Sequence, residues 1–171
     1  MAEKPVIELK AIQVSQFASQ ETNCYSASLF VDGQRWGTVG NDGHGGADHF
    51  HGVDGRNYGH LAILNERIAA TFPKVDLGEG LGEVDADLEL VCSEIVTTFL
   101  ITKDFKRAIG SYLLFTRTDK PGLFQVPLKQ KGKTFAHQVV ADAVRVDKPG
   151  FVSLNALPFD EALAIYRANA K

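Results

Sequence analysis

The alternation of apolar and polar positions is clearest in the first third of the chain. Residues 6–14 alternate until the phase slips at Ile12, which predicts a strand with a bulge or a twist at this point. Residues 25–31 alternate throughout, and the Asp32-Gly33 pair that follows favours the left-handed backbone angles of a tight hairpin turn. We therefore expect residues 34–39 to return antiparallel to residues 25–31.

Apolar residues at helical spacing follow in two segments. The positions from Leu61 to Phe72 predict one helix, with Asn57 as its cap and Pro73 as its stop. An acidic connection over residues 74–84 leads to the second segment. There, the acidic residues before Leu88 favour a helix start, and apolar residues line one face up to position 100. A further turn or two is expected over residues 102–109, with Gly110 ending the helix.

The second half of the chain mixes strand and helix signals. Residues 112–116 and 123–128 predict two strands joined by the turn TDKPG. Residues 135–144 fit a short helix, although their β-branched side chains leave a strand open. A short strand is expected over residues 150–154, and the amphipathic pattern that begins at Phe159 predicts a C-terminal helix.

The order of these elements predicts an α+β fold, with antiparallel β-hairpins packed against several amphipathic helices. The chain has 171 residues, a length that fits one domain spanning residues 1–171. Its apolar content of 44% and charged content of 23% are ordinary for a globular protein. The amino-terminal residues lack a charged-then-apolar leader and no apolar run approaches about 18 residues, so we expect a cytoplasmic protein without a membrane span.

Residues 40–60 form the most biased stretch of the sequence. The segment GNDGHGGADHFHGVDGRNYGH holds four of the five histidines of the chain, together with seven glycines and three aspartates. So many glycines predict an ordered loop without regular secondary structure, in which the backbone can approach a ligand closely. The loop is expected to lead directly into the helix that Asn57 caps.

The side chains of His44, Asp48, His49 and His51 are the candidate metal ligands. Imidazole and carboxylate groups suit zinc or another first-row divalent metal. In an extended segment His49 and His51 point the same way, and a turn at the glycines would bring His44 to them. A metal-bound water would then make the protein a metal-dependent hydrolase. The alternative is that these histidines are hydrogen-bonded loop residues that hold no metal and that the protein has no cofactor.

The same stretch is also a candidate anion site for a nucleotide or another phosphate ligand. Successive glycine amides and the positive end of the following helix attract phosphate. The candidate ligand-binding residues are Asn41, Asp42, Gly43, His44, Gly45, Gly46 and Arg56. The sequence lacks the GxxxxGK[ST] motif of phosphate-binding loops. The alternative is a rigid turn built by side-chain-to-backbone hydrogen bonds.

No complete catalytic constellation is found, and no catalytic residue is assigned. Cys24 could in principle join a loop histidine and Asp42 in nucleophilic catalysis. Both cysteines nevertheless lie in apolar patterns, so we interpret Cys24 and Cys92 as buried structural thiols of a protein from a reducing compartment.

The charged residues are unevenly distributed along the chain. Residues 76–94 are acidic, whereas the middle of the chain is basic. The basic side chains are Lys103, Lys106, Arg107, Arg117, Lys120, Lys129, Lys131 and Lys133. They could meet the phosphates of a nucleic acid, but regularly interleaved aromatic residues for base stacking are missing. A solvated face, or electrostatic steering towards a charged protein partner, is the alternative interpretation.

The segments ETNCYSASLFVDGQRWGTVGNDGHGG and NALPFDEALAIY resemble an uncharacterised family of small proteins from bacteria, phages and other mobile elements. The shared features are the VDG turn at residues 31–33 and the NDGHGG loop at residues 41–46. The resemblance implies a phage or mobile-element setting and supplies no activity. Together these observations predict a small non-catalytic binding or inhibitory protein that acts on a macromolecular partner. The metal-dependent hydrolase and the nucleotide or phosphate binder are the alternatives.

Overall fold

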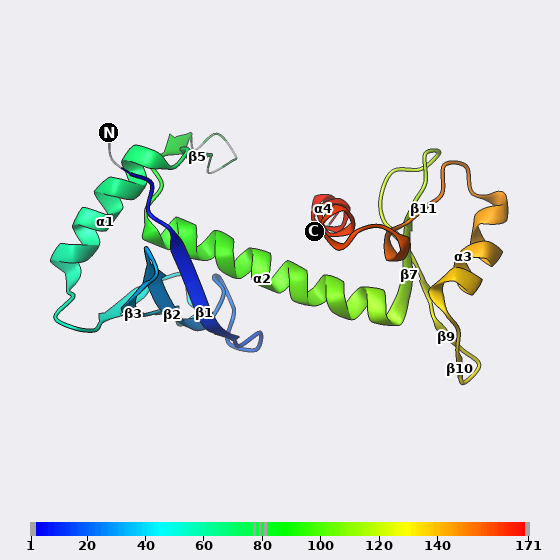
Figure 1. Cartoon of the computed structure of the whole chain (residues 1–171), viewed down its shortest axis with the longest axis horizontal. Coiled ribbons are helices and arrows are strands. Elements are labelled where there is room, and N and C mark those ends of the chain that lie inside the picture. The colour runs from blue at the N-terminus through cyan, green and yellow to red at the C-terminus, as the bar shows by residue number, and fades with distance from the viewer. Residues whose placement is uncertain (1–2, 77, 79, 81, 170–171) are drawn as a thin grey trace. The chain divides into compact units, whose positions relative to one another are not determined.

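The computed structural model describes residues 3–76, 78, 80 and 82–169 (Figure 1). Helices make up 38% and strands 28% of the chain, and every paired strand is antiparallel, so the predicted α+β class is confirmed. The chain divides into two compact units, residues 1–98 and residues 99–171. The two units are described separately below. A single domain over residues 1–171 stays a prediction.

A four-stranded antiparallel sheet of order β1-β2-β3-β4 is the centre of the first unit. Its strands are β1 (Ile7–Val14), β2 (Tyr25–Val31), β3 (Gln34–Asn41) and β4 (His49–Gly52). The predicted irregularity in β1 is confirmed and has the form of a bulge, because the register with β2 shifts between Lys10 and Gln13. Ala11, inside this shift, has a φ of 53°.

The Asp32-Gly33 turn between β2 and β3 is confirmed. Both residues have the positive φ angles that a two-residue hairpin of this kind requires, 50° and 77°. The Asp32 carboxylate accepts a hydrogen bond of 2.9 Å from the backbone N–H of Val6 and one of 3.1 Å from Arg67. The Asp32 side chain therefore also connects the turn to the residue before β1 and to the first helix.

The prediction that residues 40–60 form a loop without regular structure is wrong in part. The third strand continues to Asn41, and residues 49–52 pair with it as β4. The physical reason is a glycine of β3 that lies just before this stretch. A Cβ at Gly37 would lie 2.0 Å from the carbonyl oxygen of His51, so the missing side chain lets the two strands meet. The sequence suggested that glycine prevents strand pairing in this region, but at this position glycine makes the pairing of β3 with β4 possible.

Helix α1 (Tyr58–Thr71) follows with the predicted cap. The side-chain oxygen of Asn57 accepts hydrogen bonds from the backbone N–H groups of Gly59 and His60, at 3.0 and 3.4 Å. Leu64 and Ile68 are buried. In the acidic connection, β5 (Val75–Asp76) pairs with β6 (Glu83–Val84), and residues 77, 79 and 81 lie outside the described residues.

The second predicted helix and the turns expected after it are one continuous helix, α2 (Leu88–Ser111). Gly110 does not end it, as the sequence suggested, but lies within its last turn. The carboxylate of Asp87 accepts a hydrogen bond of 2.9 Å from the N–H of Leu90 at the helix start. The boundary between the two units falls inside this helix, between Thr98 and Phe99.

The second unit contains a three-stranded sheet of order β11-β7-β8. Its central strand β7 (Tyr112–Thr116) is buried on both faces. Leu113 and Phe115 belong to one hydrophobic cluster, and Leu114 belongs to another with Phe105 of α2. The remaining elements are β8 (Phe124–Pro127), β9 (Lys129–Gln130), β10 (Lys133–Thr134), α3 (His137–Val144), η1 (Arg145–Asp147), β11 (Val152–Ser153), η2 (Leu154–Ala156) and α4 (Phe159–Asn169).

The segment over residues 135–144, left open between helix and strand, is therefore mostly helical, and the predicted C-terminal helix is confirmed. The side chain of Asn155 joins several elements of this unit. It accepts a hydrogen bond of 2.8 Å from the N–H of Leu114 and donates to the carbonyl oxygens of Ile109 and Tyr112. Within the described part of the chain, no helix combines the length and apolar character needed to cross a membrane.

Replacing two glycines of the first sheet with alanine should show what steric exclusion adds to backbone strain. Both have positive φ angles, 77° at Gly33 and 156° at Gly37, but only Gly37 is closely approached by another backbone. A Cβ added at Gly33 would meet no atom within 4 Å, so Gly33→Ala should cost only the left-handed backbone penalty, about 1 to 2 kcal/mol of unfolding free energy. Gly37→Ala should cost more than Gly33→Ala, because the new methyl group would collide with the β4 backbone. Urea unfolding of both variants measures the difference, and equal losses would contradict the close approach of β3 and β4.

Candidate functional site

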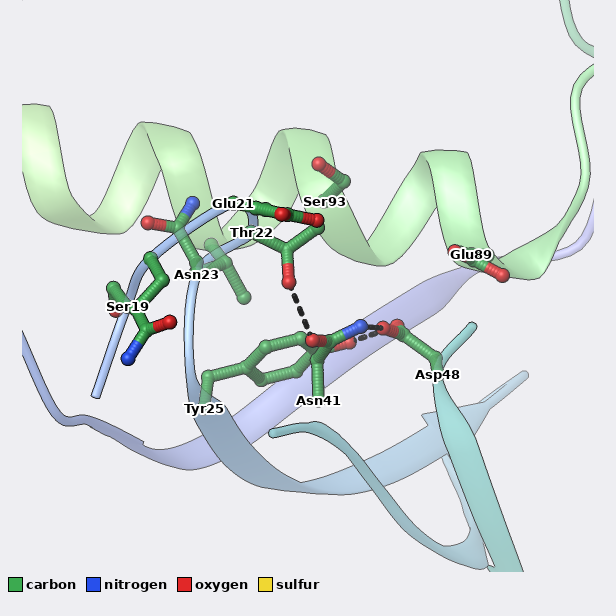
Figure 2. Close-up of a pocket in the computed structure, with 11 residues that line it drawn as sticks. Ser19, Glu21, Thr22, Asn23, Tyr25, Asn41, Asp48, Glu89 and Ser93 are labelled. Carbon is green, nitrogen blue, oxygen red and sulfur yellow. Dashed lines mark hydrogen bonds between the residues drawn. The ribbon is translucent and has the colours of Figure 1, made fainter. Parts of the chain in front are cut away.

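A polar cavity of about 420 Å³ opens in the first unit. Figure 2 shows its lining, which comes from the loop after β1, from the sheet and from the first turns of α2. The lining residues are Ser19, Gln20, Glu21, Thr22, Asn23, Tyr25, Asn41, Asp48, Glu89, Ser93 and Val96.

One carbonyl group, that of Gly43, accepts several hydrogen bonds from the loop over residues 15–24. The oxygen of Gly43 accepts the N–H groups of Gln20 and Glu21, at 2.9 and 3.0 Å, and more weakly that of Thr22 at 3.5 Å. Gly43 has a φ of 85°, and a Cβ there would lie 2.2 Å from the carbonyl oxygen of Ala18. Only glycine therefore allows the loop to come this close.

Asn41, at the end of β3, is the polar centre of the site and is 5% exposed. Its side-chain oxygen accepts hydrogen bonds from the hydroxyl of Thr22 at 2.6 Å and from the N–H of Gly43 at 2.8 Å. Its side-chain nitrogen donates to the carbonyl oxygen of Gly46 at 2.8 Å and to Oδ1 of Asp48 at 3.0 Å. This one amide therefore connects the loop, the glycine-rich turn and the start of β4.

Tyr25 and Asp48 meet at the cavity wall. The buried Tyr25 hydroxyl donates a hydrogen bond to Oδ2 of Asp48 (Figure 2). Burial, and next this hydrogen bond, raise the pKa of Tyr25 well above its ordinary value, so the phenol stays neutral. Both carboxylate oxygens of Asp48 are thus held by neutral donors, Tyr25 and Asn41, and no hydrogen bond here neutralises the negative charge.

The charge of Asp48 also affects the pKa values of two neighbouring groups. Burial and the Asp48 carboxylate raise the pKa of Glu89, while a hydrogen bond from the backbone N–H of Asp48 acts in the opposite direction. Burial and Asp48 also raise the pKa of the Cys92 thiol to about 12. Among the described residues that line the cavity there are three carboxylates and no lysine, arginine or histidine. The cavity is therefore electronegative.

The structure brings Asn41 and Asp48 of the predicted set to the cavity, and it explains the neighbouring glycines as a turn. The N–H of Gly43 is bonded to Asn41, and that of Gly45 to the hydroxyl of Thr22 at 3.4 Å. Two amides of the proposed phosphate nest are therefore already occupied. Hydrogen bonds from side chain to backbone support the alternative of a rigid turn.

The histidines are distributed over different contacts. Nε2 of His49 lies 3.1 Å from Oδ1 of the exposed Asp42, and Nδ1 of His60 lies 3.1 Å from the side-chain oxygen of its cap Asn57. His44 is exposed in the turn, and His51 is exposed in β4. Within the described residues no group of three histidine, cysteine, aspartate or glutamate side chains is arranged to hold a metal ion. A metal site at His44, Asp48, His49 and His51 stays a prediction.

Arg56, the predicted cation of the anion site, is engaged with β3. Its guanidinium donates a hydrogen bond of 3.1 Å to Gln34 and lies 5.4 Å from the ring centre of Trp36. The interpretation of both cysteines as buried thiols is confirmed for Cys92, which is 0% exposed. It is wrong for Cys24, which is half-buried because it stands where the polar loop enters β2.

Sequence reasoning missed the cavity residues Tyr25, Glu89 and Ser93. Tyr25 looks like an ordinary core position of an alternating strand, and its hydrogen-bond partner is 23 residues away. A usable signal was present on α2. Glu89 and Ser93 are four residues apart and Val96 follows three later, so two polar residues lie on a face that continues with a buried apolar residue.

The comparisons with known proteins supply no relative. No protein-family model, curated protein or solved structure matches the chain. The function is therefore argued from the geometry of the site.

The buried thiol of Cys92 predicts a loss of stability in alkali. The ordinary thiol pKa of 9.0 applies to the unfolded chain and about 12 to the folded one, so between these values the unfolded state loses its proton first. The free energy of unfolding should therefore fall as the pH rises from 9 to 12, by up to about 1.4 kcal/mol per pH unit from this group. Urea unfolding across this range measures the slope.

Two alanine variants test that assignment. Cys92→Ala removes the group and should give a shallower slope, whatever its effect on stability at neutral pH. Cys24→Ala is the matched control, because it removes a thiol and leaves Cys92 in place. Identical slopes in all three proteins would show that Cys92 does not cause the alkaline loss.

Proposed function

We propose that the protein is a non-catalytic binding or inhibitory protein that acts on a protein partner, in a phage or mobile-element setting. The observation that carries the proposal is Phe17, whose side chain is 99% exposed. It belongs to the same loop, residues 15–24, whose later residues line the polar cavity. An exposed aromatic residue in a loop that also lines a polar cavity has the composition of a recognition surface.

The backbone around Phe17 is held in place. Ser19 donates both its N–H, at 3.1 Å, and its hydroxyl, at 2.8 Å, to the carbonyl oxygen of Ser15. The N–H of Cys24 donates to the hydroxyl of Ser19 at 2.9 Å. These bonds close a tight turn over residues 15–19, with Phe17 at its tip. A partner that buries this ring gains apolar contact area and loses little entropy in ordering the loop.

The groups around the cavity support binding rather than catalysis. The Tyr25 hydroxyl and the side-chain amide of Asn41 are engaged with Asp48. The raised pKa of Cys92 keeps its thiol protonated, which is the opposite of the activation that a nucleophilic cysteine needs. The exposed lysines of the β9–β10 hairpin in the second unit add a basic surface that would steer an acidic region of a partner.

The test is an affinity measurement with a purified partner. Tagged protein is recovered from its host, a stoichiometric bound protein is identified by mass spectrometry, and the complex is reconstituted from purified components. Phe17→Ala should weaken the complex by about 2 kcal/mol or more, the loss expected for a central aromatic contact, which is roughly 30-fold in Kd.

Val146→Ala is the control for this measurement. Val146 is also a highly exposed apolar residue, but it belongs to the second unit. Its replacement should change Kd by less than about twofold. Circular dichroism checks that both variants fold. Equal affinities of the natural protein and Phe17→Ala, or a host that yields no stoichiometric partner under several conditions, would contradict the proposal.

A further inference from the structure

We infer that the polar cavity receives a cationic side chain, lysine or arginine, of the protein partner. This inference rests on the proposed function, because it names the group that the partner inserts beside Phe17. The cavity, rather than the glycine-rich turn alone, is then the ligand site of this protein. Such a site binds a cation, whereas the glycines of the sequence suggested a site for a phosphate anion.

The charge of the lining selects a cation. Asp48, Glu89 and Glu21 contribute carboxylates from three different segments, and the rest of the described lining is uncharged. The glycine turn makes room for one of them, since a Cβ at Gly45 would lie 2.1 Å from Oε2 of Glu21. An anion would be repelled by this set of groups, whereas an ammonium or guanidinium group would find acceptors on several sides.

The central carboxylate is fixed but still able to accept. Asp48 receives one hydrogen bond on each oxygen, from Tyr25 and from Asn41. An ionised carboxylate has about four acceptor positions, so roughly two remain for a ligand. Both donors are neutral and the described lining holds no cationic side chain, so a bound cation would bring an opposite charge to this carboxylate. Because its geometry is fixed before binding, the site would lose little entropy on forming the contact.

The remaining lining fits the stem of such a side chain. Carbon atoms of the lining residues contribute apolar surface, and the hydroxyl of Ser93 and the amide of Asn23 contribute polar groups beside it. Lysine and arginine commonly lay their methylene groups along apolar surface while the charged end reaches polar groups. A volume of about 420 Å³ lies at the small end of the range for ligand pockets, which suits one side chain with its flanking backbone.

Capped tripeptides on the full chain test this inference directly. The probes are acetyl-Gly-Lys-Gly-amide and acetyl-Gly-Arg-Gly-amide, with acetyl-Gly-Gln-Gly-amide as the neutral control, and binding is followed by amide chemical shifts in NMR titrations. At least one cationic peptide should bind at least tenfold more tightly than the glutamine peptide and shift the amides of residues 41–48. Equal binding of all three peptides, or no saturable shift with any of them, would overturn the inference.

Two charge-neutralising variants locate the site. Glu89→Gln should weaken the cationic peptide by at least fivefold, whereas Glu66→Gln, which removes the same charge from an exposed position of α1, should change it by less than twofold. Because the pKa of Glu89 is raised, the affinity should begin to fall at a higher pH than for an ordinary glutamate as the solution is acidified. Equal effects of the two variants would show that the cation binds elsewhere.

A lysine introduced into the cavity wall tests the inference through the melting temperature, without any added ligand. Ser93 is an exposed residue of α2 on the cavity wall, so its replacement should not prevent folding. Ser93→Lys should melt at a higher temperature than Ser93→Gln, because the ammonium offsets the repulsion between Asp48 and Glu89. It should also abolish binding of the cationic peptides. A Ser93→Lys melting temperature at or below that of Ser93→Gln would contradict the cationic cavity.

The results separate this inference from the proposed function. Putrescine serves as a free amine, and if it binds more than tenfold more tightly than the lysine peptide, the cavity is a small-amine site and the side-chain inference fails. Loss of the partner in Phe17→Ala without cationic binding would leave the proposed function standing and remove this inference. Cationic binding in the cavity, with a partner affinity that does not depend on Phe17, would retain the cavity's chemistry and remove the proposed function.

Discussion

The first unit depends on one buried amide, that of Asn41. Strand pairing brings β3 beside β2. The four hydrogen bonds of this side chain join the loop after β1, the glycine turn and the start of β4, and the Gly43 carbonyl adds further hydrogen bonds to the loop. A buried amide is costly unless its donors and accepting oxygen are matched, and here they are. Any rearrangement of the three segments would leave part of it unmatched. The amide therefore specifies one arrangement, as satisfied buried polar networks do.

The same hydrogen bonds explain why the cavity is charged. Asn41 and Tyr25 orient Asp48 with neutral donors, so the fold keeps a carboxylate in place and leaves its charge uncompensated. Such an arrangement does not add stability by itself. Burial of Glu89, and next the Asp48 carboxylate, raise the pKa of Glu89, so the charged form of this neighbour is disfavoured. Uncompensated charge at a cavity wall is an expected property of a site that is completed by a ligand.

The sequence predicted the structural features that depend on residues close together in the chain. The Asp32-Gly33 turn, the bulge after Lys10 and the Asn57 cap all follow from local backbone preferences, and all are present. It did not predict β4 or the Tyr25–Asp48 contact, because both depend on partners distant in the sequence. The short segment His49–Gly52 carries no strand pattern of its own, and Gly37 of β3 leaves the space that its backbone needs to pair. Most of the fold could therefore be predicted from the sequence. Of the cavity, the sequence predicted only two residues, Asn41 and Asp48, and not that they form one site.

The glycines and the histidines of residues 40–60 consequently have different explanations. Gly37, just before this stretch, and Gly43 are required by backbone atoms that approach closer than a side chain would permit. His60 supports a helix cap, and His49 contacts Asp42 at an exposed position, so neither lines the cavity. The residues that give the cavity its chemistry are the acids, one of which, Asp48, lies between the glycine turn and β4. A glycine-rich turn beside a carboxylate resembles a phosphate-binding loop in sequence, since in both the glycines let the backbone come close to another group. The sign of the lining charge distinguishes them, and here it is negative.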